Sequence, residues 1–184
     1  MLFLRQIAST ADYGNLPAWG LKVRATLQRG WTITSMAKAK VAIVDSSALI
    51  SLANVEDALH AQAVQLDEIL TADGWLVLLP TEVFAETLNA IGKKMSRQDS
   101  VLVGRAIVER YDARDIDFIH AEPHLYDLAL KLQGWGKGGP SFVDCLVMAL
   151  ADEYGTKHIF GFDATFKKNG YKPPERERSR LQEA

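Results

Sequence analysis

The chain has 184 residues, of which 48% are hydrophobic and 24% are charged, the balance of an ordinary globular protein. This composition excludes disorder over most of the chain, and no apolar run reaches the roughly 18 residues that cross a bilayer. The single cysteine, Cys145, excludes an internal disulfide and a cysteine-rich zinc module. A cytoplasmic location without membrane association is therefore expected.

The formal net charge of -2 conceals an asymmetry along the chain. Residues 1–40 carry a net charge of +5, whereas residues 41–184 carry -7. Residues 1–40 are predicted to be a basic N-terminal extension. One interpretation is that the protein starts at Met36; the other is that the extension is a basic arm. Residues 41–171 are predicted to form one domain, and residues 172–184 a charged C-terminal tail.

Short apolar strands and helices alternate from residue 41 onward. Strands are expected at 41–44, 75–79, 116–119 and 158–162. Helices are expected at 46–53, 55–70, 81–94, 98–111, 123–133 and 142–154, with Leu59 on the inner face of the second. This alternation predicts an α/β fold with a parallel sheet covered by helices on both faces. In such sheets, ligands bind beyond the carboxyl ends of the strands.

Acidic residues occur where the predicted strands end or where the next helix begins. They are Asp45, Glu82, Glu86, Asp144 and Asp163. Each also has a purely architectural explanation, because the three aspartates stand at positions typical of helix caps. The two glutamates are four residues apart and so share one helix face, which solvent exposure alone would explain. The sequence nevertheless places all five at one end of the predicted sheet.

Several carboxylates gathered at one edge would repel each other, and a divalent cation would relieve that repulsion. An oxygen-only set of ligands indicates Mg²⁺, with Mn²⁺ as the alternative, rather than zinc. The four histidines lie on separate predicted elements and lack ligand spacing. Such a site is suited to hydrolysis of a phosphodiester, because the metal activates water and neutralises charge that develops on phosphorus.

Four segments resemble, in order, the motifs of PIN-domain ribonucleases: residues 44–50 (VDSSALI), 80–88 (PTEVFAETL), 141–151 (SFVDCLVMALA) and 162–166 (FDATF). In size and style the chain is similar to the VapC toxins of bacterial type II toxin–antitoxin pairs. The resemblance implies a three-layer α/β/α sandwich with a central, mostly parallel sheet. It also implies a metal-dependent endoribonuclease that acts on RNA, is commonly a homodimer, and is inhibited by a cognate antitoxin protein.

The resemblance also assigns roles to particular residues. By position, the catalytic and metal-ligating acids are Asp45, Glu86, Asp144 and Asp163. Ser47 matches the small hydroxyl residue that often accompanies the first acid, and Glu82 is an accessory residue. Of these acids, Asp163 is expected to act through a water molecule or to orient Ser47 or Asp45.

RNA binding requires local positive charge, because the domain as a whole is acidic. The candidates are Lys137 in a glycine-rich loop, Trp135 in the same loop, and Lys167 and Lys168 beside Asp163. Trp135 would stack on an unpaired base. The alternatives are that the lysines are simply solvated and that the tryptophan packs under its own loop.

Three rival interpretations follow from the same residues. A phosphatase with an aspartate nucleophile is disfavoured, because position 47 holds a serine where a second acid would be expected. A PIN-like domain that binds RNA or a partner without turnover is the second alternative. A housekeeping RNA-processing nuclease, rather than a toxin, is the third.

Overall fold

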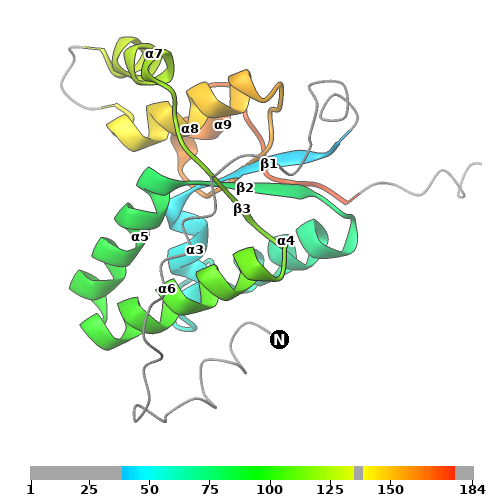
Figure 1. The fold of residues 1–184 in the computed structure, drawn as a ribbon, viewed down its shortest axis with the longest axis vertical. Helices are drawn as coiled ribbons and strands as arrows, with labels where there is room; N and C mark the ends of the chain where they lie inside the picture. Colours follow the sequence, from blue (N-terminus) through cyan, green and yellow to red (C-terminus); the bar gives the residue numbers. More distant parts are fainter. Residues whose placement is uncertain (1–38, 135–138, 177–184) are drawn as a thin grey trace, which may run out of the picture.

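Four parallel strands form one sheet within residues 39–134 and 139–176, the part of the chain that the computed structural model describes (Figure 1). The strands are β1 (Val41–Val44), β2 (Leu76–Pro80), β3 (Asp117–Ile119) and β4 (Ile159–Phe160). Their order across the sheet is β3-β2-β1-β4. Ile43 of β1 pairs with Leu78 on one side and with Ile159 on the other. The predicted strands are confirmed, although β4 is shorter than expected.

Helices cover both faces of this sheet, as the sequence pattern predicts. They are α3 (Ser46–Ala53), α4 (His60–Ala72), α5 (Thr81–Lys94), α6 (Arg97–Asp112), α7 (Pro123–Gln133), α8 (Phe142–Glu153) and α9 (Ala164–Lys168). Figure 1 shows α3, α4, α5 and α6 on one side of the sheet and α7, α8 and α9 on the other. The fold is therefore an α/β/α sandwich. None of its described helices is long and apolar enough to span a membrane.

The predicted helix at 55–70 begins later than the sequence suggested. α4 starts at His60, and Leu59 is 39% exposed instead of facing the core. The cause is Asp57, whose Oδ1 accepts hydrogen bonds from the backbone N–H of Leu59 at 2.8 Å and from the hydroxyl of Ser51 at 3.2 Å. Local bonds from an aspartate side chain compete with helix formation, and here they stabilise a turn.

Burial in the core explains why α8 is held firmly against one face of the sheet. Seven consecutive residues of α8, from Cys145 to Ala151, are buried between the sheet and the neighbouring helices. A helix that is apolar all round is stable only when it is enclosed. All of β1 is buried as well. These two elements bring the start of α8 and the end of β1 to fixed positions in the sandwich.

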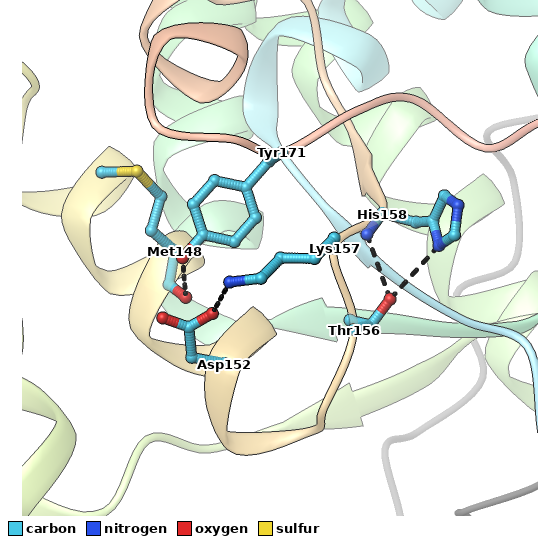
Figure 2. Close-up of polar contacts among 6 residues, drawn as sticks. All are labelled: Met148, Asp152, Thr156, Lys157, His158 and Tyr171. Atoms are coloured by element: carbon cyan, nitrogen blue, oxygen red, sulfur yellow. Dashed lines mark hydrogen bonds and ion pairs between the residues drawn. The ribbon is translucent and has the colours of Figure 1, made fainter.

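Polar contacts around β4 hold this short strand in place (Figure 2). The Thr156 hydroxyl donates to the carbonyl of Val41 at 2.6 Å and accepts from the backbone N–H of His158 at 3.0 Å. The Tyr171 hydroxyl donates to the carbonyl of Met148 at 3.1 Å. These bonds link the segments on either side of β4 to β1 and to α8, and the parallel pairing of Val44 with Phe160 places the carboxyl ends of β1 and β4 side by side.

The basic N-terminal extension and the C-terminal tail lie largely outside the described residues. Residues 1–38 of the extension and residues 177–184 of the tail are outside them, as are residues 135–138. The prediction that Met36 starts the protein also lies outside the described residues.

Candidate active site

Asp45 lies directly after β1 and is only 3% exposed. Its Oδ2 accepts a hydrogen bond from the backbone N–H of Ser47 at 3.0 Å and another from the Ser47 hydroxyl at 2.5 Å. The same hydroxyl accepts from the backbone N–H of Phe162 at 2.9 Å. Asp45 therefore caps α3, as its position predicted, while Ser47 joins it to the segment after β4.

Gly161 lets the chain after β4 approach Asp45 closely. A Cβ built on Gly161 would lie 2.7 Å from the Cβ of Asp45 and 3.0 Å from Cε2 of Phe166. Only glycine fits such an approach without displacement. β1 and β4 are neighbours at the place where the strand order reverses, which is where open α/β sheets bind ligands. Gly161 was not among the predicted site residues, although it falls inside the predicted strand at 158–162, and a glycine within a strand often marks close backbone approach.

The surroundings of Asp45 disfavour its charged form. Burial raises the pKa of Asp45 to about 6, while the hydrogen bonds from Ser47 lower it. The carboxylates of Asp144 and Glu86 are smaller causes in the same direction, because like charges disfavour the ionised form, and the value of about 6 is the net result of all these causes. Of the predicted acids, Asp144 and Glu86 are thus the two whose charge acts on Asp45.

Asp144 and Glu86 lie on two helices, α8 and α5, which cover opposite faces of the sheet (Figure 1). Asp144 lies in the first turn of α8 and forms a capping box with Ser141. The backbone N–H of Ser141 donates to Asp144 Oδ2 at 2.7 Å, and the backbone N–H of Asp144 donates to the Ser141 hydroxyl at 3.0 Å. Glu86 is half-buried in α5, which packs on α3. The cap holds the Asp144 carboxylate in one orientation.

Asp163 and Glu82 have other partners. Asp163 is exposed and accepts a hydrogen bond from the backbone N–H of Thr165 at 2.7 Å, so it caps α9. Glu82 accepts hydrogen bonds from the hydroxyl of Tyr126 and from that of Thr81. Neither acid is among the charges that raise the pKa of Asp45. The sequence analysis missed Tyr126, and nothing in the sequence near it signals this contact.

The candidate RNA-binding residues are only partly described by the structure. Lys167 and Lys168 are exposed in the last turn of α9, a few residues after Asp163. Trp135 and Lys137 lie outside the described residues. Lys167 and Lys168 therefore remain candidates on the basis of exposure and position.

Residues 42–171 match the PIN domain. The chain belongs to the PIN domain family. This PIN domain has a fold similar to the crystal structure of Mycobacterium tuberculosis VapC20, a toxin that cleaves the sarcin–ricin loop. The TM-score is 0.61 at 23% sequence identity, and the match covers 73% of this chain and 98% of VapC20. No curated protein matches the sequence.

PIN-domain nucleases generally use divalent metal ions, and the residues of this PIN domain fit such an ion by their charge. A buried carboxylate on which two other carboxylates act creates negative potential that a hard, oxygen-seeking cation would relieve. Between residues 39 and 134 and between 139 and 176, however, no three acidic, histidine or cysteine side chains are gathered as a ready-made metal site. Asp45, Asp144 and Glu86 are the residues that would hold the ion, with small side-chain movements or through water molecules.

Proposed function

We propose that this PIN domain is an endoribonuclease that requires Mg²⁺, with Mn²⁺ as the alternative. The observation that carries the proposal is the buried Asp45 at the reversal of strand order, with Asp144 and Glu86 acting on it. Carboxylates that act on one another in this way suit metal-assisted hydrolysis of a phosphodiester. The nuclease family of the chain supports the same reaction class.

In this mechanism the protein residues arrange charge and hold the reacting groups. When bound, a divalent cation would lower the pKa of a water molecule and would neutralise negative charge that develops on the phosphate. Asp45, Asp144 and Glu86 are its proposed protein ligands, and Asp163 is a further candidate that acts through a water molecule. Ser47 keeps Asp45 oriented and favours its ionised form, which is the form that binds a cation. Lys167 and Lys168 are proposed to contact the RNA backbone.

The test of the enzymatic proposal is cleavage of a structured RNA with and without Mg²⁺. The sarcin–ricin stem-loop is a suitable first substrate, because VapC20 cleaves that loop. Wild type should cleave it in Mg²⁺ and stop in EDTA, whereas Asp45→Asn and Asp144→Asn should be inactive but folded. A well-folded, metal-loaded wild type that cleaves none of a panel of structured RNAs would overturn the proposal. Binding without cleavage would favour the PIN-like binding protein.

We further propose that the nuclease is a cytoplasmic toxin that forms a homodimer and is inhibited by a cognate antitoxin protein. This proposal rests on the likeness to VapC20, which is a toxin. Expression of wild type should arrest bacterial growth, and expression of Asp45→Asn should not. Co-expression of the small protein encoded beside the gene should restore growth. Active nuclease without growth arrest would instead favour a housekeeping RNA-processing enzyme.

A further inference from the structure

We infer that Tyr126 is a positioning residue that sets the separation of Glu86 and Asp144 by joining the helices that carry them. The inference rests on the proposed function, in which these two acids hold the metal with Asp45. Tyr126 lies on α7, which packs against α8. Glu86 is on α5 and Asp144 is on α8. Helix α7 therefore packs beside α8 and contacts α5 through Tyr126.

The two ends of the Tyr126 side chain bind different helices. Its hydroxyl donates a hydrogen bond to Oε1 of Glu82 in the first turn of α5. Its ring stacks on Phe142, the first residue of α8, with ring centroids 6.3 Å apart and an angle of 16° between the planes. A tyrosine has few rotatable bonds, so it fixes the distance between two partners at little cost in side-chain entropy.

Both partners of Tyr126 stand next to the proposed metal ligands. Glu82 is four residues before Glu86, so the two side chains lie on one face of α5, one helical turn apart. Phe142 is two residues before Asp144, within the turn that the capping box closes. A change in the Tyr126 contacts is therefore expected to shift the start of α5 relative to the start of α8, and with it the two acids.

Glu82 is better suited to this structural link than to binding the metal itself. One of its carboxylate oxygens accepts the bond from Tyr126, and the other accepts the Thr81 hydroxyl at 3.2 Å. The hydrogen bond to Glu82 also raises the pKa of Tyr126, which keeps the phenol protonated and able to donate. Because both oxygens are engaged, Glu82 has less freedom to turn toward a cation than Glu86 has.

The experiment compares Tyr126→Phe with a matched loss of hydroxyl elsewhere. Tyr126→Phe retains the ring stack and removes only the bond to Glu82. The control is Tyr171→Phe, which removes the hydroxyl bond to Met148 at the far part of α8. The affinity of the full chain for Mn²⁺ is measured by calorimetry without RNA, and kcat and KM are measured on a structured RNA with Mg²⁺. Measurements are made well below the melting temperature of each variant.

Tyr126→Phe should weaken Mn²⁺ binding about tenfold and lower kcat by a similar factor with little change in KM, because residues that orient metal ligands affect affinity and activity by about 10- to 100-fold. Glu82→Ala should have the same effect, and the double variant should be no worse than either single variant. Glu82→Gln, which keeps an acceptor for the phenol, should behave like wild type. Tyr171→Phe should leave Mn²⁺ affinity and kcat unchanged.

The inference is overturned if Tyr126→Phe and Glu82→Ala bind Mn²⁺ as Tyr171→Phe does; RNA cleavage by wild type would then leave the nuclease proposal standing. If wild type binds Mn²⁺ but cleaves no RNA, the nuclease proposal fails and the Mn²⁺ affinities alone decide the inference. If wild type neither binds Mn²⁺ nor cleaves RNA, both are overturned.

Discussion

Gly161 lies so close to Asp45 that a Cβ on residue 161 would be 2.7 Å from the Cβ of Asp45 and 3.2 Å from its Oδ2. Real Cβ atoms do not approach other carbon atoms this closely, so a side chain at position 161 must displace the acid or the strand end. The glycine at position 161 thus allows the chain after β4 to pass close to Asp45, at the end of β1. The consequences of this contact can be tested by adding a single methyl group.

Gly161→Ala is expected to lower the free energy of unfolding by about 1–3 kcal/mol, the usual cost of overpacking, and to reduce RNA cleavage strongly. The activity should fall because the new methyl group pushes on the carboxylate of Asp45. Urea denaturation and initial cleavage rates measure the two effects. Gly92→Ala in α5 is the control, because its Cβ would meet Ser100 at an ordinary 3.7 Å. That variant should be more stable by about 0.5–1 kcal/mol and fully active. Full activity of Gly161→Ala would contradict the proposed role of Asp45.

Ser47→Ala is expected to shift the acid side of the pH–activity profile to higher pH. The serine donates its backbone N–H and its hydroxyl to Asp45, and both bonds lower the pKa of that acid. Loss of the hydroxyl bond raises the pKa of Asp45 above about 6, so a higher pH is needed to ionise it. The backbone N–H of Phe162 also loses its acceptor, which costs about 1–3 kcal/mol of stability.

The measurement for Ser47 is kcat/KM between pH 5 and pH 9 at a fixed Mg²⁺ concentration. Ser47→Thr keeps a hydroxyl and should retain the wild-type profile. Ser46→Ala, which changes the neighbouring serine of the same helical turn, is the control for general effects on α3. An unchanged acid limb in Ser47→Ala, at reduced or full activity, would contradict the role given to the hydroxyl.

Asp45→Asn is expected to stabilise the metal-free protein at neutral pH while abolishing cleavage. The pKa of Asp45 is about 6 in the folded protein, against an ordinary value of 3.8. Between these values the folded protein holds a proton that the unfolded chain has released, so stability falls as pH rises through this window. The loss amounts to about 3 kcal/mol when 1.36 kcal/mol is assigned to each pKa unit.

Urea denaturation in EDTA at pH 4 and at pH 7 measures this effect. Ionisation of Asp45 should make wild type less stable at pH 7 than at pH 4, and Asp45→Asn should lose less stability over the same change in pH. At pH 7 the variant should be the more stable protein by up to about 3 kcal/mol. Saturating Mg²⁺ should reverse the order, because the cation binds the ionised aspartate of the folded state. If Asp45→Asn is less stable than wild type at pH 7 in EDTA, burial of the ionised Asp45 does not lower the free energy of unfolding as predicted.

The sequence predicted the fold well because apolar periodicity reports burial directly. The buried runs of β1 and α8 could have no other place than the centre of a covered sheet. The start of α4 was missed, because the pattern does not reveal that Asp57 bonds to Leu59 and ends the turn there. The boundaries of elements depend on such single contacts, whereas their existence depends on many residues together.

The candidate site was predictable only in part for a similar reason. A rule about strand ends finds Asp45, directly after β1, and Glu86, on the helix after β2, whereas Asp144 lies on α8, which follows another helix. The contacts of the neighbouring residues Ser47 and Glu82 come from residues distant in sequence, Phe162 and Tyr126. No spacing along the chain encodes those contacts. Asp163 shows the limit of the rule, because it lies at the same edge but its carboxylate caps α9.

The two glutamates of α5 provide the sharpest comparison between neighbouring acids. Glu86 acts on Asp45, whereas both oxygens of Glu82 are engaged by Tyr126 and Thr81. Glu86→Gln removes a proposed ligand charge and should lower cleavage by at least about 100-fold, more than the loss of an orienting group costs. Glu82→Gln makes the same chemical change one turn away and should keep nearly full activity. When the cleavage rate is measured against Mg²⁺ concentration, only Glu86→Gln should need more Mg²⁺ to reach half of its maximal rate. Equal losses in both variants would mean that Glu82 also binds the metal, and the division of roles within α5 would be wrong.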